Sequence, residues 1–179
     1  MKRWIALLAA LLIIFSGCTG RTPEKTTGEF LSCLIKSDVK SAGKLTLSGK
    51  LTLDTGSKAA AAIYQPLFSA MQYSVGGSLI DGETSTVNVT LLVVDLQELI
   101  NQVSLEVMQQ MIASGNKGSG DLFYTLLLEK LVAEDVPMVS YTVTAQLIRE
   151  KGHWKIDMEG SPEFAQAVGG GVQGLILAS

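Results

Sequence analysis

The chain has 179 residues and a mass of 19.0 kDa, which suits one globular domain with a leader or a tail. Hydrophobic residues make up 47% of the chain and charged residues 17%, so a disordered polar chain is not expected. The formal net charge of −3 argues against a nucleic-acid binder, because such proteins neutralise phosphates with an excess of Lys and Arg. One histidine and two cysteines are too few for a disulfide framework or for most metal centres, so neither a metal nor another cofactor is expected.

Residues 1–17 have the pattern of a secretory signal peptide. Lys2 and Arg3 precede an uncharged apolar run from residue 4 to residue 15. A helix of this length spans about 18 Å, whereas the hydrocarbon core of a bilayer is about 30 Å thick. The run is therefore too short for a stable transmembrane helix and has the length of a signal-peptide core.

The leader ends in the segment Phe15-Ser16-Gly17-Cys18. This segment resembles the lipobox of bacterial lipoproteins, although Phe15 stands where leucine is usual. The resemblance implies that the signal peptidase recognises Phe15, Ser16 and Gly17, cuts before Cys18 and leaves a diacylglycerol on the Cys18 thiol. Two acyl chains suffice for stable anchoring, so the mature protein would be tethered to the membrane without spanning it. An ordinary secretory signal with a chance cysteine, or a short membrane anchor, is the alternative.

The mature chain is predicted to begin with a short tether over residues 18–22. A single domain is expected over residues 23–168, followed by a glycine-rich, apolar and flexible tail over residues 169–179. Thr22 and Pro23 predict the start of a helix, because Thr caps helices and Pro is favoured at the first helical position.

Ser37 and Asp38, where this helix should end, predict the cap of a second short helix that continues to Ala42. Residues 44–47 and residues 50–53 both read Lys-Leu-Thr-Leu. The repeat alternates apolar and polar residues, and it leaves open either a small hairpin or a loop.

Residues 58–71 are rich in alanine and then in aromatic residues, which predicts one helix that Pro66 kinks or ends. Alternating apolar residues then predict a strand that ends near Leu79 and a second strand from Val87 to Val93. Asp81-Gly82 lies between the two strands and predicts a two-residue hairpin turn.

A helix is predicted from Leu96 to Met111, because its apolar residues trace a single stripe with polar residues opposite. A glycine-rich loop over residues 114–120 follows, and Asp121 predicts the cap of another helix that runs to Leu131. The first turns of this last helix are apolar on nearly every side. It should therefore be either well buried or part of a surface that binds a partner.

A long strand is predicted over residues 139–147, followed by a turn over residues 150–152 and a returning strand over residues 154–157. A last short helix should open at Pro162. Hairpins of neighbouring strands pair antiparallel by default. The expected fold class is therefore α+β, with about four antiparallel strands packed against helices.

Three stretches carry a further resemblance: residues 22–42, residues 81–95 and residues 143–156. The first has the two helix starts, the second reads Asp-Gly-Glu-Thr-Ser-Thr-Val-Asn-Val-Thr near its beginning, and the third ends in a turn and Trp-Lys-Ile. Together they are similar to small bacterial lipoproteins with the nuclear-transport-factor-2-like, cystatin-like cone fold, many from families of unknown function and often from Gram-positive bacteria. The resemblance implies a cone-shaped, curved antiparallel sheet. The helical pair between the hairpins is longer than the simplest members require.

No catalytic residue is predicted, and the chain is not expected to be an enzyme. His153 lies in a predicted turn, where a solvated side chain is favoured over a general base. Residues 169–174 fit Gly-x-Gly-x-x-Gly but lack the preceding strand and the following helix of a dinucleotide site. Cys33 lies in an apolar stretch and is interpreted as a small buried hydrophobe in preference to a reactive thiol.

Six side chains are candidates for lining a pocket between helix and sheet: Tyr64, Phe68, Met71, Tyr73, Phe123 and Tyr141. The alternative is that they belong to the ordinary core.

The predicted function is that of a lipid-anchored, extracytoplasmic protein of the cell envelope, a non-catalytic binding or interaction module on the outer face of the cell membrane. The alternative is a protein that binds a small apolar ligand in the cone cavity. The expected partners are the membrane, through the lipid anchor, and either an envelope protein or a small apolar ligand, but no nucleic acid. An exposed apolar stripe along residues 122–131 would favour a protein partner, whereas a closed cavity would favour a ligand.

Overall fold

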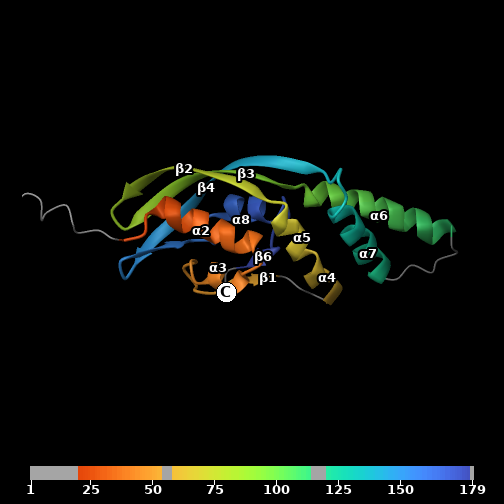
Figure 1. Cartoon of the computed structure of the whole chain (residues 1–179), viewed down its shortest axis with the longest axis horizontal. Helices are drawn as coiled ribbons and strands as arrows, with labels where there is room; N and C mark the ends of the chain where they lie inside the picture. Colours follow the sequence, from red (N-terminus) through yellow and green to blue (C-terminus); the bar gives the residue numbers. More distant parts are fainter. Residues whose placement is uncertain (1–19, 54–57, 114–119, 178–179) are drawn as a thin grey trace, which may run out of the picture.

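The structure is a computed structural model and describes residues 20–53, 58–113 and 120–177. An open four-stranded antiparallel sheet in the order β2-β3-β4-β5 arches over a layer of helices (Figure 1). This arrangement confirms the predicted α+β class. The strands of the sheet are β2 (Gln72–Asp81), β3 (Thr84–Val94), β4 (Met138–Glu150) and β5 (His153–Ile156).

Helices α2 (Pro23–Ile35) and α8 (Pro162–Val168) cover the concave face of the sheet (Figure 1). One aromatic ring from each helix packs against the other. The ring centroids of Phe30 and Phe164 are 6.1 Å apart, and both side chains are fully buried. Strand β3 alternates strictly between buried and exposed residues along most of its length, because only one face of the sheet is covered. The convex face is therefore left to solvent.

The predicted start of the first helix is confirmed. The Thr22 hydroxyl accepts a hydrogen bond from the Lys25 N–H at 3.3 Å, and Pro23 occupies the first helical position. The helix ends at Ile35, short of the predicted Ser37, because Ser37 adopts a left-handed backbone conformation with φ of 58°. Asp38 then accepts from the Ser41 N–H at 3.0 Å and caps α3 (Val39–Gly43), also as predicted.

The β2–β3 hairpin forms, but its turn is shifted by one residue from the prediction. Asp81 pairs with Thr84, so the two central residues are Gly82 and Glu83 and not Asp81 and Gly82. Gly82 has a φ of +59° at the first central position, where type II′ turns place glycine because of its freedom to adopt positive φ. The β4–β5 turn lies at residues 151–152, inside the predicted range.

The single helix predicted over residues 58–71 is two short helices, α4 (Lys58–Ala62) and α5 (Tyr64–Ser69). The break falls at Ile63 and not at Pro66. Pro66 lies in the first turn of α5, where its missing N–H removes no intrahelical hydrogen bond, so the proline is accommodated there.

The repeated Lys-Leu-Thr-Leu segment forms a loop and not a hairpin. The loop is held against β5, because the Leu47 N–H donates to the Ile156 carbonyl at 2.8 Å and the Ile156 N–H donates to the Leu45 carbonyl at 2.8 Å. It leads into β1 (Thr52–Leu53), which pairs with β6 (Ile176–Leu177) in a separate two-stranded sheet.

The glycine-rich C-terminal segment is part of the domain, which corrects the prediction of a flexible tail from residue 169. The Leu96 N–H donates to the Gly170 carbonyl at 3.1 Å, and Ile176 is buried in the core. A Cβ on Gly170 would lie 2.6 Å from the Val94 carbonyl oxygen, so glycine permits the close approach. The last two residues, 178–179, lie outside the described part of the chain.

Helices α6 (Leu96–Ala113) and α7 (Gly120–Leu131) form a helical arm that extends beyond the sheet, at the end opposite the two hairpin turns (Figure 1). Both helices were predicted from their apolar pattern. Lys130 and Glu106 form an ion pair of 3.2 Å between them. Of the loop predicted over residues 114–120, residues 114–119 lie outside the described part of the chain, as does the Asp121 side chain, whereas Gly120 already begins α7. Among residues 20–53, 58–113 and 120–177, no helix combines the length and hydropathy that crossing a bilayer requires.

Candidate functional site

The residues predicted to direct lipidation, Phe15, Ser16, Gly17 and Cys18, lie outside the described residues. The described chain begins at Gly20, beside the β4–β5 turn, where a Cβ on Gly20 would lie 3.9 Å from the Gly152 carbonyl oxygen. The folded domain starts immediately afterwards with the Thr22 cap. Gly20, the first described residue of the predicted tether, therefore lies at the hairpin-turn end of the sheet.

The six side chains predicted to line a pocket do not share one site. Phe68 and Met71 are buried in the core cluster. Tyr73 is exposed at the sheet edge, and its hydroxyl donates to the Gly28 carbonyl at 3.0 Å. Tyr141 packs against the core from β4. Among the described residues, Tyr64 and Phe123 line a common pocket that the other four do not line, so the structure corrects the predicted set.

That pocket lies between α4, α5 and the base of the helical arm. Its volume is about 210 Å³. Its wall is almost entirely apolar, with two tyrosines, and consists of Ala60, Ile63, Tyr64, Leu96, Ile100, Phe123, Tyr124, Leu127, Val172 and Leu175. Residues from the C-terminal segment complete the wall, which sequence reasoning missed because it assigned that segment to a flexible tail.

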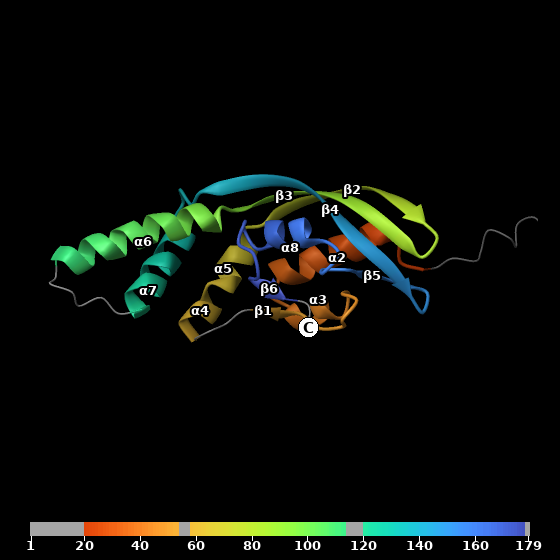
Figure 2. The same cartoon turned by 180° about the vertical axis from the view of Figure 1, so that it is seen from behind.

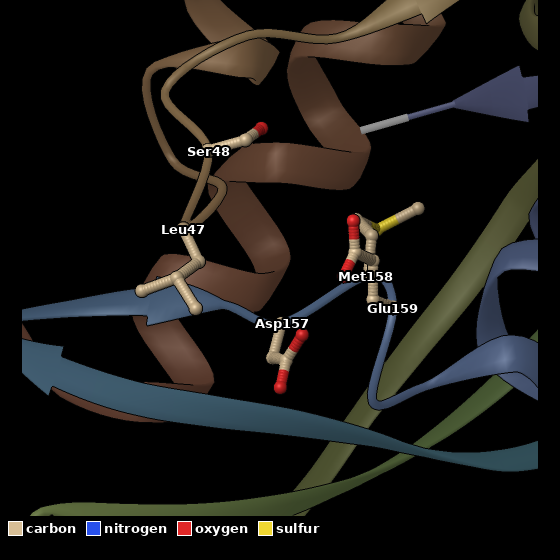
Figure 3. A pocket seen from close by; sticks show the side chains of 5 residues that line it. All are labelled: Leu47, Ser48, Asp157, Met158 and Glu159. Carbon is tan, nitrogen blue, oxygen red and sulfur yellow. The ribbon is translucent and has the colours of Figure 1, made fainter. Parts of the chain in front are cut away.

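A second depression of about 220 Å³ lies where the loop after α3 meets the segment after β5 (Figure 3). Leu47 and Ser48 line it from the loop, and Asp157, Met158 and Glu159 line it from the other side. The Asp157 carboxylate accepts from the Gly160 N–H at 2.9 Å, so part of its hydrogen-bonding capacity serves the local turn.

The titratable residues considered in the sequence lie away from the apolar pocket in the described part of the chain. His153 is exposed in the β4–β5 hairpin, and neither it nor a carboxylate lines the apolar pocket. Asp95 caps α6 by accepting from the Glu98 N–H at 2.9 Å. Within the described ranges, no group of three or more His, Cys, Asp or Glu side chains is placed to hold a metal ion.

Cys33 lies partly buried on α2 and packs against the core. Burial raises the pKa of its thiol, and the nearby carboxylates of Asp38 and Glu29 act in the same direction. A raised pKa lowers the thiolate fraction at neutral pH. The environment is therefore that of a packing cysteine, in line with the preferred interpretation of the sequence.

The helical arm carries an apolar surface that sequence reasoning missed. The outer-face stripe consists of Leu105, Met108 and Ile112 on α6, which are between 56% and 76% exposed. The buried residues of the same helix, Leu96, Leu99 and Val103, face the core. The signal was present in the sequence as a second apolar spacing of i, i+3 and i+7 on the side opposite the core stripe.

Helix α7 adds half-buried apolar residues to the arm. Leu127 and Leu131 are buried, whereas Leu126 and Leu128 are only partly covered, and Val132 just beyond the helix is exposed. The helix thus combines the two predicted alternatives, because one side packs into the domain and the rest contributes to the surface.

Fold and surface together define a small α+β domain with an exposed helical arm. No family model matches the sequence, and no curated protein matches it. A solved structure that matches the fold is that of a predicted lipoprotein (ycdA) from Bacillus subtilis subsp. subtilis str. 168. The two chains share 16% sequence identity with a TM-score of 0.47, and the match covers 87% of this chain and 49% of that chain. The present chain thus spans about half the length of that protein, and a likeness of this degree assigns no function.

Proposed function

We propose that this chain is a lipid-anchored protein on the extracytoplasmic face of a bacterial cell membrane. We further propose that it binds another envelope protein through the helical arm and catalyses no reaction. The observation that carries the binding role is the outer-face stripe of α6, formed by Leu105, Met108 and Ile112. Single exposed apolar residues are common on protein surfaces, but several on one helix face are typical of an interaction site.

The anchoring role rests on the leader and on the short tether. A positively charged start, a short apolar run and small residues before Cys18 have the pattern of a lipoprotein signal. From Cys18 to Thr22 the chain can extend by at most about 14 Å. An acyl group on Cys18 would hold the domain close to the bilayer.

The helical arm lies at the end of the molecule opposite the start of α2 (Figure 2). An anchor at the start of α2 therefore leaves the outer-face stripe free to meet a partner away from the anchoring point. This separation supports a protein partner in preference to insertion of the stripe into the same membrane.

The chemistry of the stripe specifies the kind of partner. Residues 95–137 contain seven acidic and two basic residues, a net charge of −5. Spacing of i, i+3 and i+7 is that of a helix that lies in an apolar groove of its partner. The partner is accordingly a protein with an apolar groove and a basic rim, because charge complementarity favours the encounter.

A photo-crosslinking amino acid at Met108 of the full chain, in native membranes, tests this proposal. We expect an adduct of one defined mass, which the double variant Leu105→Glu/Ile112→Glu abolishes while the chain remains folded and membrane-bound. The matched control carries the crosslinker at Thr142, an exposed position on the convex face of the sheet. Equal crosslinking at Met108 and Thr142 contradicts the proposal, and an adduct of twice the chain mass assigns the stripe to self-association instead.

The pocket between α4, α5 and the arm supports a second candidate, binding of a small apolar ligand. Its volume of about 210 Å³ is below the range of about 300–1,000 Å³ that is typical for drug-sized ligands. It is large enough for a single ring or a short alkyl chain. This candidate predicts that a small aromatic probe such as indole raises the melting temperature of the parent but not of Val172→Trp, which fills the pocket.

A further inference from the structure

Lysines are concentrated in one short segment, which runs from the end of α2 through α3 and along the outer edge of β5. Residues 36–50 contain four lysines and one aspartate, a net charge of +3, although the whole chain is acidic. We call this the lysine face, and its members Lys36, Lys40, Lys44 and Lys50 are all exposed. Helix α3, which carries Lys40, packs against α2, and the loop that follows it lies along β5 (Figure 2).

The loop that presents these lysines is fixed in shape. The buried Thr46 hydroxyl donates to the Gly43 carbonyl at 2.8 Å and also lies 3.2 Å from the Lys50 carbonyl oxygen. The Lys155 ammonium donates to the Lys44 carbonyl, which brings a fifth lysine from β5 to the same loop. Leu47 lies between the lysines and is 39% exposed, so the loop combines positive charge with one accessible apolar side chain.

The one acid within this segment, Asp38, leaves its net charge positive, and the carboxylates of Asp157 and Glu159 lie across the depression from Leu47 and Ser48. The Asp38 carboxylate is engaged by Ser41 at the start of α3. Hydrogen bonding by Ser41 lowers the pKa of Asp38, and the charges of Lys40 and Lys44 act in the same direction. Lys40 and Lys44 therefore lie close enough to Asp38 to interact with it electrostatically. With one acid against four lysines, the net charge of the segment is positive.

Charge is thus divided between two parts of the molecule. The lysine face has a net charge of +3, whereas the segment that contains the helical arm has −5. A negatively charged surface attracts the first and repels the second, so it orients the protein even though the net charge of the chain is negative. The tether adds to this effect, because it keeps the lysine face at high effective concentration near the bilayer.

We propose that the lysine face docks onto the anionic headgroups of the membrane that holds the acyl anchor, and that this contact turns the helical arm toward its partner. The inference rests on the proposed membrane anchoring and specifies how the anchored domain sits. Each lysine near an anionic membrane contributes about 1 kcal/mol, an effect that decays within a Debye length of about 8 Å. Partly exposed Leu47 adds an apolar contact at the headgroup boundary.

Vesicle co-sedimentation of the unacylated mature chain tests the docking without the anchor. The protein begins at residue 18 and carries Cys18→Ser, and it retains every described helix and strand. We expect it to bind vesicles with about 30% phosphatidylglycerol in phosphatidylcholine, and to be released by added salt. Vesicles of phosphatidylcholine alone should leave it in the supernatant. Equal binding to both compositions, or binding to neither, overturns the inference.

A pair of charge-matched variants localises the contact. Lys40→Gln/Lys44→Gln should weaken binding to the anionic vesicles by about 30-fold, since each lysine is worth about fivefold. Thr86→Glu/Thr90→Glu changes the net charge equally on the convex face of the sheet and should weaken binding far less. Equal losses in both variants overturn a localised lysine face.

The vesicle-binding experiment does not depend on whether Cys18 is acylated. Palmitate labelling of the full chain reports on the anchor, and the lysine variants should leave that labelling unchanged. Two results together would support the anchor and refute the docking: Cys18→Ala loses the palmitate label, and the unacylated chain does not bind anionic vesicles. Vesicle binding without labelling would keep the docking and refute the anchor.

Discussion

Glu24, in the first turn of α2, accepts hydrogen bonds from both the backbone N–H and the hydroxyl of Ser78 in β2. The N–O distance is 3.2 Å. Ser78 follows a bulge at which β2 loses its regular pairing with β3, and a bulge leaves a residue of the strand unpaired. The Glu24 carboxylate accepts from Ser78 just after this irregularity and joins the first helix to the edge of the sheet. The Ser78 hydroxyl hydrogen bond is the main reason that the pKa of Glu24 is below its usual value.

Glu24→Gln should destabilise the fold by about 1 kcal/mol at neutral pH, because an amide replaces a charged acceptor at a partly exposed site. A carboxyl with a lowered pKa stabilises the folded state above its ordinary pKa, and this contribution is lost as pH falls through the lowered value. Urea unfolding at several pH values should show the parent and the variant converging in acid. Glu29→Gln, which removes the exposed 2.9 Å ion pair with Arg21, serves as the control and should change stability by less than about 0.5 kcal/mol.

Gly170→Ala tests whether the C-terminal segment belongs to the domain. The new Cβ would lie 2.6 Å from the Val94 carbonyl oxygen and 3.0 Å from the Leu96 Cβ. Gly174→Ala has a similar positive φ but no atom within 4 Å of the new Cβ, so it isolates the backbone penalty. Thermal unfolding should show Gly170→Ala as the less stable variant by about 1–3 kcal/mol. Equal stabilities would mean that the segment does not pack as described.

Leu99→Ala and Leu105→Ala separate the two faces of α6. Leu99 is 1% exposed, so Leu99→Ala should lower the free energy of unfolding by about 2–5 kcal/mol, because truncation leaves a cavity. Leu105 lies on the outer-face stripe, so Leu105→Ala should change the free energy of unfolding by less than about 0.5 kcal/mol. Chemical denaturation of both variants checks this, and a large loss from Leu105→Ala would show that the stripe is covered in the free protein.

Cys33 should react slowly with iodoacetamide in the folded protein. Its raised pKa reduces the thiolate fraction, and packing against the core hinders access. Mass spectrometry of the unacylated Cys18→Ser chain at pH 8 should show alkylation well below the rate for free glutathione, and an equal rate once urea unfolds the chain. Alkylation of the folded chain as fast as glutathione would favour the alternative of a reactive thiol.

Local signals along the sequence predicted most of the elements. Thr22 and Asp38 cap the helices they were expected to cap, because their side-chain oxygens reach N–H groups of the first turn within the same segment. The alternation in β3 and β4 predicted two strands with one buried face, and the structure confirms both. Signals of this kind depend on neighbours within a few residues, so one sequence is enough to detect them.

The errors arise where distant segments decide the outcome. Gly170 looked like part of a flexible tail, but its packing depends on Val94 and Leu96, far away in the sequence. Phe68 was a candidate for a pocket wall, yet it lies fully in the core, because aromatic residues suit either position. The outer-face stripe was overlooked for a different reason. The stronger core stripe dominated the apolar pattern of α6 in the sequence. The predicted relation to the cone-fold lipoproteins stays a prediction.

The state of Cys18 is the most direct test of the account. Cells that express the full chain should incorporate labelled palmitate into it, and Cys18→Ala should abolish that label. Mass spectrometry of the membrane fraction should find a mature N-terminus at Cys18 that carries a diacylglycerol. A chain that still begins at Met1, or equal labelling of the parent and Cys18→Ala, would contradict lipid anchoring.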